Sequence, residues 1–259
     1  MYEAIAEMQV YNTMAVKGGS NIRPFLFCGE ISEEMKKTLF NLGYDPILLP
    51  AAPFLPPPVA RHPDMLLAPY GEGFLVSRAY REAHRSFFDA IAIPLTVTDE
   101  TVGPVYPDDV LLNAFTLADK VFGGKAISRY LTEGKKHIKV AQGYARCSVA
   151  FFGSGCVTSD PSLYAALTKE GIETLRIRSG HITLKGYNEG FIGGASLTLS
   201  PTLTAFFGRV EAHPDYGAME RFAAKQGVTL LSLSNEPLAD CGGGFLYPKK
   251  HEKENQSID

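Results

Sequence analysis

The sequence predicts an α/β fold: a five-bladed α/β propeller of ββαβ units, closed by joining the N-terminal and C-terminal segments. Two observations carry this prediction. A strand–strand–helix–strand pattern recurs along the chain at intervals of roughly 40–50 residues. The first unit lacks its leading strand, whereas residues 240–247 (DCGGGFLY) form a leading strand that nothing follows. The chain ends therefore complete one unit, and closing the ring removes the exposed strand edges of an open array.

The helix of each unit is indicated by capping residues and by apolar residues at helical spacing. Ser32 is a typical N-cap, and Met35 and Leu39 after it repeat at the interval that one helix face requires. A glycine just past a helix favours the left-handed cap conformation, and a strand follows each one. The helix-to-strand segments are 32–50, 80–97, 128–142, 159–177 and 214–233, with cap glycines at Gly43, Gly134, Gly171 and Gly227 and none in 80–97.

Two strands precede the helix of a complete unit. The strand next to the helix is predicted at 25–30, 73–77, 120–124, 155–159 and 205–210. The leading strand, which would line the centre of the ring, is predicted at 64–69, 109–114, 147–152, 190–197 and, at the end of the chain, 240–247. Two separate α/β domains with parallel sheets stay open as an alternative.

The length suits one large domain or two small ones, and the composition favours a cytoplasmic protein. The net charge of −3 is spread along the chain, so neither nucleic acid nor an anionic membrane is an expected partner. The N-terminus lacks the basic start and apolar block of a signal peptide. We assign residues 24–248 to the propeller domain, leave residues 1–23 as an unplaced N-terminal extension, and expect the charged tail 249–259 to be disordered.

The cysteines and glycines predict neither a metal site nor a cofactor. The four cysteines are widely spaced and form no CxxC pair, so we expect reduced thiols and no bound metal. The glycine pair in GGAS (193–196) lacks both the frame and the following helix of a dinucleotide-binding motif. We therefore expect no cofactor.

The repeat resembles that of the pentein, or guanidino-group-modifying-enzyme, superfamily, which includes arginine and agmatine deiminases, dimethylarginine hydrolases and amidinotransferases. The resemblance covers about residues 24–248 and is best locally in YPDDVLLNAFTLADKVFGGKAIS (106–128). It implies a pentein-type propeller and places Asp109 at the substrate-binding aspartate of the family. The chain looks most like a branch that lacks the usual Cys/His/Asp motifs. Residues 145 and 147 are Ala and Cys where the family has His and Asp.

In such a ring, the segments that lead into the inner strands meet at one mouth. They bring together His62, Asp64, Tyr106, Asp108, Asp109, Arg146, His181, Glu189, Asp240 and Cys241. A carboxylate-rich mouth suits a cationic ligand such as a guanidinium, whose planar fork pairs with carboxylates. The predicted substrate-binding residues are Asp64, Asp109, Arg146, Glu189 and Asp240. Alternatively, these acids only cap strand ends or face water.

The resemblance also implies a cysteine nucleophile on the last inner strand, assisted by a histidine and a carboxylate. The nearest thiol is Cys241, with His62 or His181 as the proton shuttle. This chain departs from the family because Cys241 precedes the glycines instead of following them. A buried, inert thiol is the alternative, because free cysteine is commonly a small core residue.

Three functions stay open from the sequence. The chain is a C–N bond hydrolase or transferase acting on a guanidino or related cationic small molecule, a non-catalytic pentein that binds a small polar ligand, or an interaction protein. A ribosome-binding role is disfavoured because no basic surface is indicated. The sequence leaves the oligomeric state open.

Overall fold

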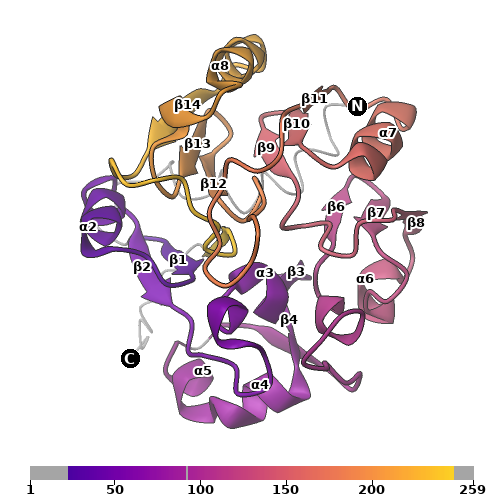
Figure 1. Ribbon diagram of the computed structural model, residues 1–259. Coiled ribbons are helices and arrows are strands. Elements are labelled where there is room, and N and C mark those ends of the chain that lie inside the picture. The colour runs from indigo at the N-terminus through magenta and orange to yellow at the C-terminus, as the bar shows by residue number, and fades with distance from the viewer. Residues whose placement is uncertain (1–22, 92, 248–259) are drawn as a thin grey trace, which may run out of the picture.

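The computed structural model describes residues 23–91 and 93–247, so the predicted N-terminal extension (apart from Arg23) and the charged tail lie outside the described residues. The described chain forms five three-stranded sheets, each of them one blade of a ring. In every blade the inner strand pairs antiparallel with the middle strand, which pairs parallel with the outer strand. The helix that connects the middle and outer strands of each blade lies on the outside of the ring (Figure 1). The predicted fold class is confirmed, and the alternative of two parallel-sheet domains is wrong.

Blade 1 joins the two ends of the chain. Its inner strand β15 (Gly244–Tyr247) pairs with β1 (Phe25–Cys28), and β1 pairs with β2 (Asp45–Leu48) across helix α2 (Glu33–Asn41). Phe27 and Phe245 lie opposite each other in the antiparallel pair. The N-terminal unit therefore takes its missing strand from the C-terminus, as the sequence predicts.

The other blades follow in chain order and have the same topology. Blade 2 contains β3 (Leu67–Tyr70), β4 (Gly73–Ser77), α4 (Arg78–Ala83), α5 (Arg85–Ile91) and β5 (Leu95–Thr98). Blade 3 contains β6 (Phe115–Leu117), β7 (Lys120–Gly123), α6 (Arg129–Thr132) and β8 (Lys136–Lys139). Blade 4 contains β9 (Ala150–Phe152), β10 (Gly155–Thr158), α7 (Pro161–Lys169) and β11 (Thr174–Arg176). Blade 5 contains β12 (Ser196–Ser200), β13 (Leu203–Phe206), α8 (Tyr216–Lys225) and β14 (Thr229–Ser232). Short helical turns precede the inner strands of blade 2, at η1 (Pro57–Val59) and α3 (Pro63–Leu66), and of blade 3, at η2 (Asp108–Val110). A further turn, η3 (Val210–Ala212), lies within blade 5 between β13 and α8.

The capping residues predicted from the sequence begin and end these helices. The Ser32 side chain accepts a hydrogen bond from the Met35 amide at 3.4 Å, and Asp160 accepts one from the Leu163 amide at 2.8 Å. Gly171 follows α7 with φ of 80°, the left-handed cap that glycine adopts without strain. Among the described residues, no helix combines the length and apolar content needed to span a membrane.

The inner strands begin later than the sequence predicts. The segments that precede them carry the candidate site. The lead-in segments, residues 62–66, 108–114, 144–149, 190–195 and 238–243, are short helical turns or irregular backbone. They replace the first part of each predicted inner strand and, in blade 3, the whole predicted strand 109–114, because β6 begins only at Phe115. Their backbone groups bond to one another across the ring. The Asp64 amide donates to the Gly242 carbonyl at 3.2 Å, and the Gly194 amide donates to the Cys147 carbonyl at 2.8 Å. Polar side chains on these segments therefore converge at the centre.

Candidate functional site

Six polar side chains on the lead-in segments are buried together at the centre of the ring. They come from blades 1 to 4 and are called the central cluster: His62, Asp64, Asn113, Arg146, Cys147 and Asp240. Hydrogen bonds and electrostatic interactions connect them. Of the predicted site residues, the structure brings together His62, Asp64, Arg146 and Asp240, whereas Asn113 and Cys147 were not predicted.

Asp64 is the most deeply buried acid of the cluster. Its side chain lies in the first turn of α3, and the residue is 0% exposed. Neither of its carboxylate oxygens has a hydrogen-bond partner among the described residues. Burial, together with the negative charge of Asp240, raises the pKa of Asp64 to about 8, against the opposing effects of Cys147 and Arg146. A buried carboxyl group without partners is costly, so this position calls for a donor or a cation.

Asn113 connects three lead-in segments. Its Oδ1 accepts hydrogen bonds from the backbone amides of Arg146 at 2.8 Å and Cys147 at 3.2 Å. Its Nδ2 donates to the Asp64 carbonyl at 3.1 Å and to Sγ of Cys147 at 2.9 Å. The two amide donors fix the orientation of the Asn113 side chain, because only its oxygen can accept them.

Both carboxylate oxygens of Asp240 accept hydrogen bonds from backbone amides. Its Oδ1 accepts from the Gly242 amide and its Oδ2 from the Phe191 amide, each at 2.9 Å. Nδ1 of His62 lies 3.7 Å from Oδ1. Burial lowers the pKa of His62 although the charge of Asp240 raises it, so the imidazole is neutral near pH 7. The pair of Asp240 and neutral His62 is a positioned carboxylate beside a potential proton carrier.

Arg146 is held away from the acids of the cluster. Its guanidinium lies 5.1 Å from the ring centroid of Phe151 and 5.5 Å from that of Phe245. Nη1 donates to the Val149 carbonyl at 3.3 Å. Within the described ranges, Arg146 makes no ion pair with a carboxylate at 4.0 Å or less. Two phenyl rings therefore hold its charge in a cation–π arrangement, and Asp64 keeps unpaired oxygens.

Asp109 lies in the turn η2, beside a group of aromatic rings. Its Oδ2 accepts from the Tyr144 hydroxyl at 2.8 Å, and its Oδ1 is buried without a partner in the described part of the chain. Burial raises the pKa of Asp109, against the hydrogen bond from Tyr144. The Tyr144 ring lies 5.9 Å from the ring of Tyr106 and 6.2 Å from that of Phe191. We call Tyr106, Tyr144 and Phe191 the aromatic rim; Tyr106 is exposed and the other two are half-buried.

Cys241 has surroundings unlike those of an activated thiol. It is half-buried and packs against the apolar cluster that contains Leu26 and Cys28. Burial raises the pKa of the Cys241 thiol, and the charge of Asp240 raises it further. Among the described groups that shift this pKa, all are acids or thiols and none is a cation. Its role as nucleophile stays a prediction, without support from its neighbours.

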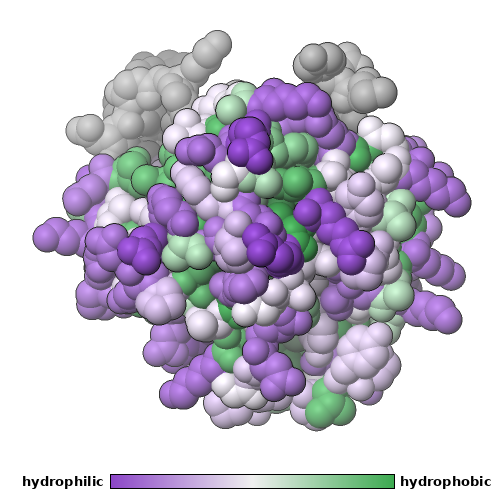
Figure 2. All heavy atoms as spheres, turned by 45° about the horizontal axis from the view of Figure 1, so that its top comes forward, coloured by the Kyte–Doolittle hydropathy of each residue, from purple (hydrophilic) through white to green (hydrophobic). Residues whose placement is uncertain are grey.

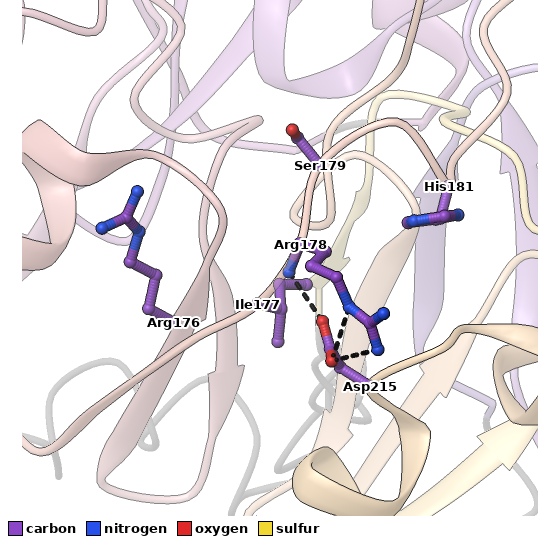
Figure 3. A pocket seen from close by; sticks show the side chains of 6 residues that line it. All are labelled: Arg176, Ile177, Arg178, Ser179, His181 and Asp215. Carbon is purple, nitrogen blue, oxygen red and sulfur yellow. Dashed lines mark hydrogen bonds and ion pairs between the residues drawn. The ribbon is translucent and has the colours of Figure 1, made fainter.

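His181 and Glu189 lie in the loop between β11 and β12. The His181 ring is exposed and lies 5.3 Å from the ring of His213. It lines a surface hollow of about 500 Å³ with Arg178 and Asp215, whose charged groups pair at 2.7 Å (Figure 3). Glu189 is half-buried and its Oε2 lies beside Gly180. Neither side chain makes a described contact with the central cluster.

The surface was compared with the central cluster as a place for a binding site. On the face shown in Figure 2, hydrophilic residues cover much of the surface and hydrophobic residues form small separate groups. Within the described residues, no three His, Cys, Asp or Glu side chains are grouped closely enough to hold a metal ion. We take the central cluster, where buried polar side chains from four blades meet, as the candidate site.

Two kinds of comparison relate this chain to known proteins. The model of a family of unknown function, DUF6873, matches residues 27–245. The amidinotransferase SxtG from Microseira wollei, of the saxitoxin biosynthetic pathway, has a similar structure, with a TM-score of 0.51 and 10% identity over 84% of this chain and 79% of that chain. A dimethylarginine dimethylaminohydrolase in an adduct with S-methyl-L-thiocitrulline gives a TM-score of 0.50 and 9% identity, over 86% of this chain and 97% of the other. A search of curated proteins gave no match. Both structures are penteins, so the likeness establishes the pentein fold.

Proposed function

The chain belongs to the DUF6873 family and has the pentein fold, and from this premise we propose that it binds a small cationic ligand of the guanidinium or amidinium class at the centre of the ring. Asp64 is the buried anchor and Asp109 is the second carboxylate. The two acids come from neighbouring blades, and each has at least one buried oxygen without a partner among the described residues.

One observation carries this proposal: the unpaired carboxyl group of Asp64. Leaving buried acceptors unsatisfied costs about 1–3 kcal/mol each, and more for charged groups. The central cluster already contains a cation, Arg146, but two phenyl rings and the Val149 carbonyl hold it apart from Asp64. A bound cation would supply both the charge and the donors that Asp64 lacks.

The surroundings favour a planar cation over a compact one. A guanidinium or amidinium presents N–H groups in a fixed fork and binds flat against an aromatic ring. The aromatic rim adjoins Asp109 through the hydroxyl of Tyr144, and the Phe191 amide bonds to Asp240. The site therefore combines free carboxylate oxygens with ring faces, the two features that such a cation uses.

We propose further that this ligand is the substrate of a C–N bond hydrolase or transferase. The named activities of the two similar structures, amidinotransferase and dimethylarginine dimethylaminohydrolase, support this class without specifying it. His62 is better suited than His181 as a proton carrier, because His62 lies within the central cluster beside Asp240. Asp64, Asp109 and Asp240 are the proposed binding acids, and Glu189 has a weaker claim because it lies in the same loop as His181.

The test is titration calorimetry of the full chain with agmatine and with arginine, each compared with its ureido counterpart, in which an uncharged urea group replaces the guanidinium. We expect binding of the guanidinium compounds and at least tenfold weaker binding of the ureido compounds, a difference of about 1.4 kcal/mol or more. Asp64→Asn removes the anchor and weakens cation binding by a similar factor or more. Asp108→Asn is the matched control, because Asp108 is exposed in the same turn as Asp109 and carries the same charge. Equal affinity of wild type and Asp64→Asn for agmatine, or equal affinity of the wild type for the guanidinium and ureido compounds, would overturn the proposal.

A further inference from the structure

Arg146 is a buried guanidinium whose hydrogen-bond donors are mostly unused. It belongs to the lead-in segment of blade 4, and the residue is 9% exposed. Its backbone amide is fixed by a hydrogen bond to Oδ1 of Asn113 at 2.8 Å. Every nitrogen of a guanidinium donates, yet within the described residues the side chain makes a single hydrogen bond, from Nη1 to the Val149 carbonyl at 3.3 Å. Most of its N–H groups therefore lack a described acceptor.

The charge of Arg146 also lacks an ionised partner near pH 7. No described carboxylate lies within 4.0 Å of the guanidinium. Among the described residues, the groups that act on its charge are Asp64, Cys147 and Cys156. Asp64 has a pKa of about 8, and burial raises the pKa of both thiols, that of Cys156 to about 12. All of these groups are mostly protonated at pH 7, so the buried cation calls for a counter-charge.

The space beside the guanidinium is narrow and has no side chain from the closing segment. The rings of Phe151 and Phe245 lie 5.1 and 5.5 Å from its central carbon. An ideal Cβ placed on Gly243 would lie 3.8 Å from Nη2, and the carbonyls of Gly193 and Ser196 border the same position. Gly243 has φ of 65°, a conformation that favours glycine, so no side chain fills this position. Such a space admits a small ion more readily than the end of a longer molecule.

A second donor without a partner lies in the same lead-in segment. The Ser148 hydroxyl is buried and has no hydrogen-bond partner in the described chain. The backbone of Ser148 is fixed, because its amide donates to the Tyr144 carbonyl at 3.1 Å and its carbonyl accepts from Oγ1 of Thr158 at 2.7 Å. A hydroxyl can donate to an anion, as a guanidinium does. The free groups of this segment are thus donors, whereas those of Asp64 are acceptors.

We propose that the lead-in segment 144–149 forms a second binding site in the ring, which takes a small inorganic anion such as chloride as the counter-charge of Arg146. The Arg146 guanidinium is its main donor, and the Ser148 hydroxyl is a second donor. Water would supply acceptors to these groups but no charge. The inference goes beyond the cation site and does not depend on it, because it concerns the charge of Arg146 itself.

The first test locates the ion in the wild-type protein. Crystals of the full chain are soaked in sodium bromide, and anomalous diffraction at the bromine edge identifies bound bromide, which replaces chloride. We expect bromide in contact with the Arg146 guanidinium. Bromide found only at surface arginines, such as Arg176 and Arg178, or no bound bromide at all, would overturn the inference. This test needs no variant, so it decides even where a substitution at Arg146 prevents folding.

The second test measures thermal unfolding in sodium chloride and in sodium gluconate at equal ionic strength. The midpoint should rise by about 3–5 °C once chloride reaches about ten times its dissociation constant. Arg146→Met removes the donors and should abolish this rise. Arg176→Met is the matched control, because Arg176 is exposed on β11 of the same blade, and it should keep the full rise. An equal response of the wild type and Arg146→Met to chloride would contradict the site.

A carboxylate of the cationic ligand is the other possible source of the anion. Calorimetric titrations with arginine and with agmatine, each with and without chloride, distinguish the two sources. A free ion should leave the ratio of the two affinities unchanged. Chloride that weakens the binding of arginine but not of agmatine would assign the donors to the carboxylate of the ligand and overturn the free-ion site. An intact response to chloride without any agmatine binding would reject the cation site alone.

Discussion

The carboxylate of Asp240 lies directly against the α-carbon of Gly194. An ideal Cβ placed on Gly194 would overlap Oδ1, Oδ2 and Cγ of Asp240. The carboxylate cannot move aside without losing its hydrogen bonds from the Phe191 and Gly242 amides. Gly194 also bonds through its carbonyl to the amides of Cys241 and Gly243. A glycine is thus required where the lead-in segments of blades 5 and 1 meet the acid.

Gly194→Ala should therefore destabilise the protein by about 2–4 kcal/mol, because the new methyl group overpacks a site that cannot relax. Urea unfolding followed by circular dichroism measures the change. Gly217→Ala is the matched control: Gly217 lies in helix α8 and the nearest atom to an added Cβ is Nη1 of Arg221 at 3.5 Å. That substitution should be neutral or should stabilise by up to about 1 kcal/mol. Equal stability of Gly194→Ala and wild type would contradict the packing described above.

Asp64 should make the free protein less stable as the pH rises. Its pKa is about 8 in the folded protein, well above the value near 3.9 of an unfolded aspartate. The folded state therefore holds a proton that the unfolded state loses, and stability falls between about pH 4 and pH 8 by up to about 1.4 kcal/mol per pH unit. The groups that act on Asp64 are Asp240, Cys147 and Arg146.

Asp64→Asn removes this proton exchange and keeps the shape. We expect the variant to be more stable than the wild type at pH 8, and the difference to shrink towards pH 5. Urea unfolding of both proteins across this range, with Asp108→Asn alongside, measures the difference. If the free energy of unfolding of the wild type at pH 8 equals or exceeds that of Asp64→Asn, then Asp64 does not have a raised pKa in the folded protein.

The sequence predicts the architecture well because the ring is a repeat of local units. The cap at Ser32, the glycine at Gly171 and the orphan segment 240–247 each carry their own signal, and all three agree with the structure. The starts of the inner strands were predicted several residues too early. Segments such as 109–114 are rich in leucine, but their backbone bonds across the ring instead of within one sheet.

The site was less predictable because its contacts join distant segments. Asp64 and Asp240 could be grouped from the repeat, since each precedes an inner strand. Asn113 gave only a weak signal, a polar residue within the apolar run DVLLNA. Cys147 stood out in the sequence only as a departure from the family pattern. Its neighbours Asn113 and Asp64 are 34 and 83 positions away, so only the fold shows their relation to its sulfur.

The most direct measurement of the central claim is the number of protons released when agmatine binds. Asp64 holds a proton in the free protein below its pKa of about 8, and a cation requires the carboxylate, so binding at pH 6.5 should release about one proton. Calorimetry in buffers of different ionisation enthalpy gives this number. The account predicts about one proton at pH 6.5, almost none at pH 9.5, and none at either pH for any residual binding to Asp64→Asn. Binding at pH 6.5 without proton release, or unchanged proton release in Asp64→Asn, would contradict the assignment of Asp64 as the anchor of the site.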